Sequence, residues 1–235
     1  MKVLIALFVV SLIAFATTSL AKANANVKIA NLNAKQQALV PIAANVASGD
    51  IAKLKVALNE GLDAGLTVNE TKEIMVHLYA YCGFPRALNG LSALDEVLAN
   101  RQAKGIHEEV GKEATPIPQN TDMLALGTKV QTQLAGGPVN IKNSPAIDTF
   151  LKTHLFGDLF ARDVLDFKAR EIVTLAALAS MQGTQPQFAA HLHLGQNAGL
   201  SDEELQDIVN ILDSKVNSDI AQNAQSILDN YLAKK

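Results

Sequence analysis

Residues 64–70 read AGLTVNE, and residues 198–204 read AGLSDEE, which is the same pattern 134 positions later. The match continues on both sides of these segments, where it pairs Leu58 with Leu192, for example. A repeat at a fixed offset indicates that one structural unit occurs twice in the chain. The fold should therefore consist of two related halves.

In each copy a glycine stops one helix, and a capped helix begins shortly after it. Gly65 suits the left-handed conformation that commonly ends a helix. Thr67 then predicts an N-cap, and Glu70 three residues later completes a capping box. Ser201 and Glu204 repeat this arrangement. Each unit therefore reads as a helix, a bend, a second helix, a glycine stop and a third, capped helix.

The rest of the chain also predicts helices, because apolar residues recur at helical spacing and period-two alternation is not sustained. Aromatic content is 5% and tryptophan is absent, which also disfavours strands. We expect an all-α fold whose longest loop is 103–121, with Pro116 and Pro118. The expected helices are 34–48, 50–64, 68–82, 86–99, 122–134, 145–164, 167–182, 186–198, 202–216 and 218–233.

The N-terminus has the layout of a secretory signal peptide: Lys2, an apolar stretch at 3–16, and small residues with the A-x-A cleavage pattern. The apolar stretch is shorter than the roughly 20 residues of a membrane span, although an uncleaved anchor is the alternative. We expect a periplasmic or secreted protein without stable membrane insertion after cleavage. The expected organisation is a signal peptide (1–25), a first repeat (26–100), a linker and connecting helix (101–143) and a second repeat (144–235).

Charge and cysteine content exclude two classes of function. Cleavage would leave a net charge of about −5. A mildly acidic chain without a basic run argues against nucleic-acid binding. Cys82 is the single cysteine, so the chain can form neither an internal disulfide nor a thiol pair for redox chemistry.

Three segments resemble the carboxymuconolactone decarboxylase family. Residues 167–179 (FKAREIVTLAALA) resemble its Arg–Glu helix, His191 resembles the histidine of the next helix, and residues 79–89 (YAYCGFPRALN) resemble its Y-x-G-x-P-x-A segment. The resemblance implies an alkylhydroperoxidase D-like helical bundle of two tandem repeats that assembles as trimers or hexamers. It also implies decarboxylation of 4-carboxymuconolactone or, in thiol-bearing members, peroxide reduction. The thiol branch uses a C-x-x-C pair where this chain has SMQGTQP at 180–186, which disfavours the dithiol mechanism.

The candidate catalytic residues are Arg170, Glu171 and His191. His191 follows Glu171 by 20 residues, across one helix turnaround, so the two side chains could meet and poise the imidazole for proton transfer. Arg170 would hold the carboxylate of a substrate. The alternative is that Arg170 and Glu171 form salt bridges and His191 only packs. The positions 134 residues earlier hold groups that do not titrate: Gln36, Gln37 and Ala57.

We also predict a substrate-binding segment at Tyr81, Gly83 and Pro85, where a tyrosine lies beside a Gly-x-Pro bend. Packing is the alternative for Tyr81, and shaping the bend is the alternative for Gly83 and Pro85. We expect no metal site, because His191 and His193 would point about 200° apart on a helix, and no other cofactor. His77 has no partner that the sequence identifies and is expected to be structural.

These observations predict an enzyme that acts on a small organic acid or lactone by proton transfer or decarboxylation, assembled as a homo-oligomer. Two alternatives remain. One is an alkylhydroperoxidase-like antioxidant protein, and the other is a helical oligomer that binds a small ligand without turning it over.

Overall fold

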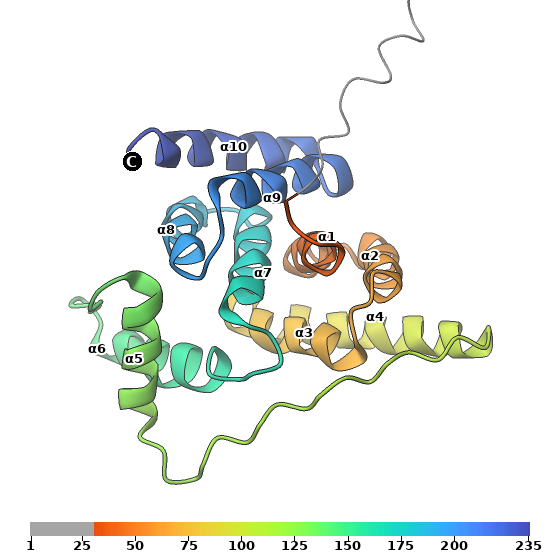
Figure 1. Cartoon of the computed structure of the whole chain (residues 1–235), viewed down its shortest axis with the longest axis horizontal. Coiled ribbons are helices and arrows are strands. Elements are labelled where there is room, and N and C mark those ends of the chain that lie inside the picture. Colours follow the sequence, from red (N-terminus) through yellow and green to blue (C-terminus); the bar gives the residue numbers. More distant parts are fainter. Residues whose placement is uncertain (1–30) are drawn as a thin grey trace, which may run out of the picture. The chain divides into compact units, whose positions relative to one another are not determined.

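The computed structural model describes residues 31–235, and the predicted signal peptide lies outside the described residues. The part of the chain that is described contains helices and no strand, so the all-α prediction is confirmed (Figure 1). None of the helices between residues 31 and 235 has the length and apolar character that a bilayer span requires. The helices are α1 (Ala34–Ser48), α2 (Ile51–Asp63), α3 (Val68–Cys82), α4 (Phe84–Ala103), α5 (Met123–Ala135), α6 (Pro145–Phe150), the π-helix η1 (Leu151–Leu159), α7 (Phe167–Ala179), α8 (Gln185–Asn197), α9 (Asp202–Lys215) and α10 (Ser218–Leu232).

Both predicted capping boxes form. The Thr67 hydroxyl accepts a hydrogen bond from the Glu70 amide at 3.1 Å, and the Glu70 carboxylate accepts one from the Thr67 amide at 2.7 Å. Ser201 and Glu204 make the same pair of bonds at the start of α9. Gly65, just before the first box, has a φ of +91°, which glycine adopts without strain. Local sequence therefore fixes where these helices begin and end.

The predicted helix 145–164 is shorter than expected and irregular. It divides into α6 and the π-helical segment η1, which ends at Leu159. A side-chain Cβ at Gly127 would lie only 1.6 Å from the backbone oxygen of Lys152, so α5 packs directly against the backbone of η1. Phe156 and Phe160 complete a small second core between these two elements. This contact with α5 was not visible in the periodicity of residues 145–164.

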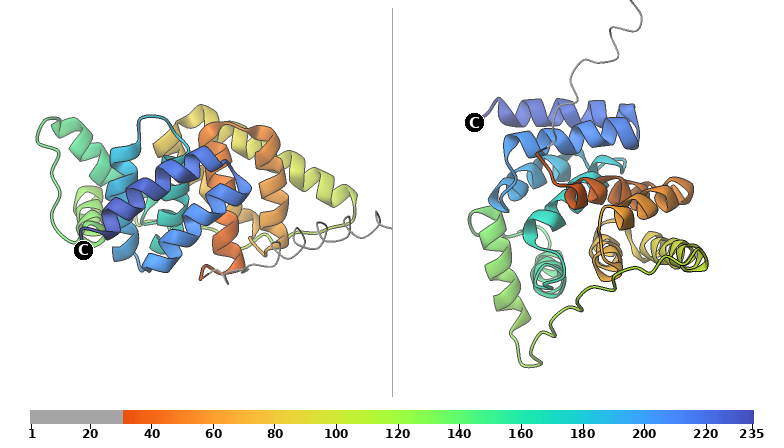
Figure 2. Two further views of the ribbon diagram at one scale, coloured as in Figure 1. Left: turned by 90° about the horizontal axis from the view of Figure 1, so that it is seen from above. Right: turned by 45° about the vertical axis from the view of Figure 1, so that its right-hand side comes forward.

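The first helices of the two repeats, α1 and α7, pack against each other at the centre of the molecule (Figures 1 and 2). Each of them also packs against the third helix of the opposite repeat, α1 against α9 and α7 against α3. Helices α3 and α4 lie on one side of the central pair, and α9 and α10 lie on the other. Every residue from 170 to 178 is buried as a result, which brings the Arg–Glu segment into the core.

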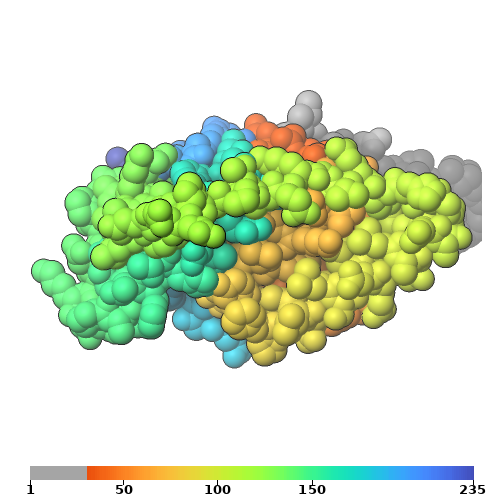
Figure 3. Space-filling view, turned by 90° about the horizontal axis from the view of Figure 1, so that it is seen from below, coloured from red at the N-terminus to blue at the C-terminus, as the bar shows by residue number. Residues whose placement is uncertain are grey.

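The predicted long loop forms an extended strap, residues 104–121, along the surface between α4 and α5 (Figure 3). The amides of Val68 and Asn69 donate to the carbonyls of Glu109 and Val110 at 3.0 and 2.9 Å. The strap thereby supplies acceptors for two amides at the start of α3, which have no partners within their own helix.

Candidate functional site

The side chains of His191 and Glu171 meet inside the second repeat. His191 Nδ1 lies 2.7 Å from Glu171 Oε2, with the carboxylate fully buried and the imidazole 13% exposed. Gly195 allows this approach, because a Cβ there would lie 2.9 Å from the side chain of Leu200 and 3.8 Å from the Cβ of Glu171. Helices α7 and α8 therefore pack closely at this point. The spacing of 20 residues correctly predicted the contact, while its catalytic role stays a prediction.

This hydrogen bond orients the imidazole. A carboxylate oxygen accepts, so Nδ1 of His191 carries the hydrogen and donates it to Glu171. The other ring nitrogen, Nε2, is then the atom that can exchange a proton with a bound molecule. The second carboxylate oxygen, Oε1 of Glu171, is buried and has no hydrogen-bond partner among the described residues.

Tyr81 places a hydroxyl group in the same cluster. Its ring packs edge-on against the His191 ring, with 5.8 Å between centroids and 74° between planes. Its hydroxyl is buried and, like Glu171 Oε1, makes no hydrogen bond within the described residues, although the Thr174 hydroxyl lies near it. Burial and then the Glu171 carboxylate raise the pKa of Tyr81, so the group stays protonated and can donate.

Arg170 points to a different side of α7 and binds a carboxylate from within the protein. Its Nη2 lies 2.7 Å from Glu73 Oε1 and 2.8 Å from the carbonyl oxygen of Arg162. Arg170 is fully buried. We expected its guanidinium to hold the carboxylate of a substrate. In the structure, the Arg170 guanidinium instead binds the carboxylate of Glu73 and is not accessible to solvent.

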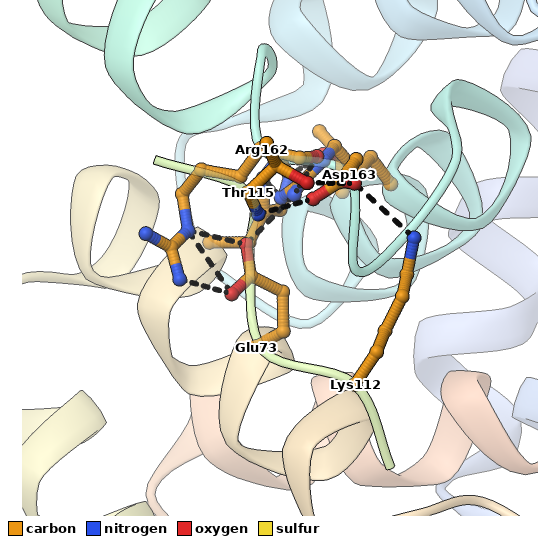
Figure 4. Close-up of polar contacts among 8 residues, drawn as sticks. Glu73, Lys112, Thr115, Arg162 and Asp163 are labelled. Carbon is orange, nitrogen blue, oxygen red and sulfur yellow. Dashed lines mark hydrogen bonds and ion pairs between the residues drawn. The ribbon is translucent and has the colours of Figure 1, made fainter. Parts of the chain in front are cut away.

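Glu73 accepts from two guanidinium groups at once. Arg162 donates to both of its carboxylate oxygens, at 2.8 and 3.1 Å from Nε and 2.8 Å from Nη2 (Figure 4). The next residue, Asp163, accepts from the Thr115 amide and hydroxyl of the strap, each at 2.8 Å. These bonds, the backbone one first, lower the pKa of Asp163 to about 2. The strap thus attaches beside the outer edge of the buried ion-pair network.

His77 links this network to the side of the molecule that holds His191. Arg170 Nη1 lies 3.3 Å from His77 Nδ1, and because a guanidinium only donates, Nδ1 accepts. The hydrogen therefore sits on Nε2, which donates to the Thr174 hydroxyl at 2.8 Å. Burial, then the charges of Arg170 and His191, hold the pKa of His77 well below its usual value. The His77 ring also packs against Tyr81, with 5.2 Å between centroids.

Sequence reasoning missed Glu73 and left His77 without a partner. One signal for Glu73 was present, since the position 134 residues later holds another acid, Asp207. Asp207 is also buried, and it accepts from the amide of Leu32 at 3.1 Å, just before α1. Each repeat therefore uses a buried acid on its third helix to hold the entry to the opposite repeat's first helix. His77 has an apolar counterpart, Ile211, so the repeat gave no signal for it.

Gly83 and Pro85 shape the bend between α3 and α4. Gly83 has a φ of +85° and a ψ of 157°, a combination that essentially only glycine adopts. Pro85 is exposed in the first turn of α4, where its fixed φ is favourable. Of the three predicted substrate-binding residues, Tyr81 is the one whose ring contacts His191. Substrate binding by this segment stays a prediction.

Comparison with known families gives two matches along the chain. The model of the carboxymuconolactone decarboxylase family matches residues 14–96 and residues 145–229, one segment in each repeat. The chain belongs to the carboxymuconolactone decarboxylase family. No curated protein matches it at a significant level. The two tandem repeats predicted from the 134-residue offset are thus two copies of the carboxymuconolactone decarboxylase unit.

In this carboxymuconolactone decarboxylase family protein, the place related by the repeat to the His191–Glu171–Tyr81 cluster is a cavity. Ala57 stands at the position of His191, and Lys215 stands at the position of Tyr81. Both line a cavity of about 430 Å³ between α1, α2 and α9. The His191–Glu171 pair therefore has no counterpart in the first copy, where Ala57 and Gln37 hold the equivalent positions.

Two other predicted features have ordinary environments. Cys82 packs against the core and donates to the Leu78 carbonyl at 3.2 Å, and burial raises the pKa of its thiol. His193 contacts Asn197 at 3.2 Å. Within residues 31–235, no group of three or more His, Cys, Asp or Glu side chains is placed to hold a metal ion.

Proposed function

We propose that this protein is an enzyme that acts on a small organic acid or lactone by proton transfer or decarboxylation, with His191 exchanging the proton. One observation carries the proposal. The His191–Glu171 hydrogen bond of 2.7 Å lies beside a buried donor, the Tyr81 hydroxyl, and a buried acceptor, Glu171 Oε1, neither of which makes a hydrogen bond within residues 31–235. Buried polar groups are nearly always paired, so groups left available beside an oriented imidazole indicate a site for a polar ligand.

The chemistry follows from these groups. In a decarboxylation, the bond between the carboxylate carbon and its neighbouring carbon breaks, carbon dioxide leaves, and the electron pair remains as an enolate. The imidazolium of His191 then gives its Nε2 proton to the enolate carbon and regains one from water. Glu171 stabilises the imidazolium through Nδ1–H. The Tyr81 hydroxyl would donate to the developing enolate oxygen.

Arg170 has an indirect role in this proposal. Its guanidinium binds Glu73, and its backbone neighbour in the same buried turn is Glu171. The ion pair joins α7 to α3, the helices that carry Glu171 and Tyr81. We therefore assign Arg170 to positioning these two groups and not to binding the substrate.

Assembly and location belong to the same proposal. We propose a homo-oligomer, trimer or hexamer, that is exported to the periplasm or secreted. Large apolar side chains on α4 and α6 are exposed in the single chain, and such residues support self-association. They are Phe84, Leu88, Ile147 and Phe150. Light scattering of the purified protein tests the assembly.

The test of function is kinetic. Purified protein is screened against lactones, unsaturated acids and hydroperoxides, and turnover is then compared in His191→Gln and Glu171→Gln. We expect kcat for a lactone or acid to fall by about 10²- to 10⁴-fold in His191→Gln, because general acid–base catalysis contributes about that much. His193→Gln is the matched control, since this exposed histidine lies on the same helix and does not contact Glu171.

The alternatives make different predictions in this assay. Hydroperoxide turnover that stops in Cys82→Ser would identify a thiol peroxidase. Binding without turnover, unchanged in His191→Gln, would identify a ligand-binding protein. Full activity in a folded His191→Gln variant would refute the proposed mechanism.

A further inference from the structure

A cavity of about 130 Å³ lies in the second repeat, where the end of α7, the start of α8 and α10 meet. None of the residues that line it belongs to the His191–Glu171–Tyr81 cluster. Its wall is formed mainly by apolar side chains, and three side-chain amides lie at its edge. The apolar residues are Leu178, Ala179, Met181, Phe188, Ile220, Ala224 and Ile227, and the amides are Gln182, Gln185 and Asn223. Ser180 also lines the cavity, and its hydroxyl donates to the Ala176 carbonyl at 2.9 Å.

The inner and outer parts of this cavity differ in exposure. Phe188 and Ala224 are each 2% exposed and form its buried inner side. The three amide side chains are exposed, so the cavity opens to solvent past them. A small molecule therefore has a route of entry, an apolar interior, and hydrogen-bonding groups at the mouth.

In the first repeat, larger side chains fill the position that corresponds to this cavity. Arg86 stands at the position of Ile220, and its guanidinium donates to the carbonyl of Ala47, which is the counterpart of Met181. Gly90 stands at the position of Ala224, and the sulfur of Met75 lies 2.6 Å from where its Cβ would be. A guanidinium and a methionine thus occupy, in the first copy, the place that the second copy leaves open.

The lining sets the class of ligand. No charged side chain is among the residues that line this cavity, so a carboxylate or ammonium inside it would be unpaired, at considerable cost. An engineered apolar cavity of about 150 Å³ lined by Leu, Ile and Phe holds benzene, which is close to the volume found here. We propose that this cavity binds an uncharged molecule of one aromatic ring, with a single polar group that hydrogen-bonds to the amides at the mouth. The site is separate from the proposed acid–base site.

Phenol is a suitable probe, and two methionines report on its binding. The protein is labelled with ¹³C at its methionine methyl groups and titrated with phenol by NMR. Met181 lines the cavity, and Met75 lies at the filled counterpart in the first repeat. The Met181 methyl signal is assigned from its loss in Met181→Leu. We expect its chemical shift to change with phenol concentration until it saturates, while the chemical shift of the Met75 methyl group does not change. Benzoate at pH 7 should bind at least about tenfold more weakly, because its charge finds no partner.

Two variants close the cavity by different means. Ile220→Arg introduces the residue that the first repeat uses, and Ala224→Leu fills the interior with an apolar side chain. Both should abolish the Met181 shift, and Gln222→Arg, an exposed position on the same helix, should leave it unchanged. If Ile220→Arg fails to fold, Ala224→Leu decides.

The proposal is overturned if phenol leaves Met181 unshifted, if Met75 responds equally, or if the shift persists in a folded Ala224→Leu variant. His191→Gln should bind phenol as the unmodified protein does. Loss of binding in that variant would place phenol at the acid–base site and would also overturn the proposal.

Discussion

Protonation of His77 should make the stability of this protein depend on pH. His77 is completely buried, and its burial, followed by the charges of Arg170 and His191, holds the pKa of its imidazole well below the ordinary value for histidine. In the unfolded chain the imidazole returns to a pKa of about 6.5. Above that pH the imidazole is neutral in both the folded and the unfolded state, so it does not contribute to the pH dependence of stability. Below it, the unfolded chain binds a proton that the folded protein does not, so the free energy of unfolding falls as the pH falls.

The size of this effect follows from the linkage of one proton. The slope is about 1.4 kcal/mol per pH unit while the unfolded chain is protonated at His77 and the folded protein is not. Between pH 6.5 and 5.0 the loss therefore reaches up to about 2 kcal/mol, and it ends once the pH passes the folded-state pKa. For a small protein this is a substantial part of its total stability.

Urea unfolding at a series of pH values from 8 to 5 measures the effect, with His77→Gln as the comparison. Glutamine keeps an acceptor for Arg170 and a donor for Thr174 but does not titrate. The unmodified protein should lose up to about 2 kcal/mol more than His77→Gln across the acid half of the series. His193→Gln, which removes an exposed histidine, should keep the full slope. Parallel curves for the unmodified protein and His77→Gln would refute the reasoning.

Two further predictions concern packing and the buried ion pairs, and urea denaturation at neutral pH measures both. Glu73→Gln leaves the Arg170 guanidinium buried without a counter-charge, so we expect a loss of about 3–5 kcal/mol; a loss below about 1 kcal/mol would show that the network does not hold α3 to α7. Gly127→Ala places a Cβ 1.6 Å from the Lys152 backbone oxygen, which no side-chain rotation can relieve, and should cost about 1–3 kcal/mol or more. Gly137→Ala meets nothing within 4 Å and is the control, so an equal loss in both glycine variants would contradict this explanation.

Local signals predicted most of the helices. Thr67 and Ser201 begin helices where the capping boxes place them, because a cap satisfies amides that belong to the same few residues. The prediction was wrong at 145–164, where the approach of α5 at Gly127 accompanies a π-helical segment and an early end. A contact between segments some 25 residues apart leaves no mark in the periodicity of either one.

The sequence by itself determined most of the helices, the duplication, and the meeting of Glu171 with His191, because all three depend on residues close in the chain or on a fixed offset. Only the tertiary structure decided the partner of Arg170. Arg170 precedes Glu171 by one position on α7, so the two side chains leave the helix about 100° apart and face different neighbours. Glu73, which binds Arg170, comes from the opposite repeat, 97 residues away. Ion pairs between such distant residues depend on which helices pack against each other. The packing of the helices is in turn a property of the whole core.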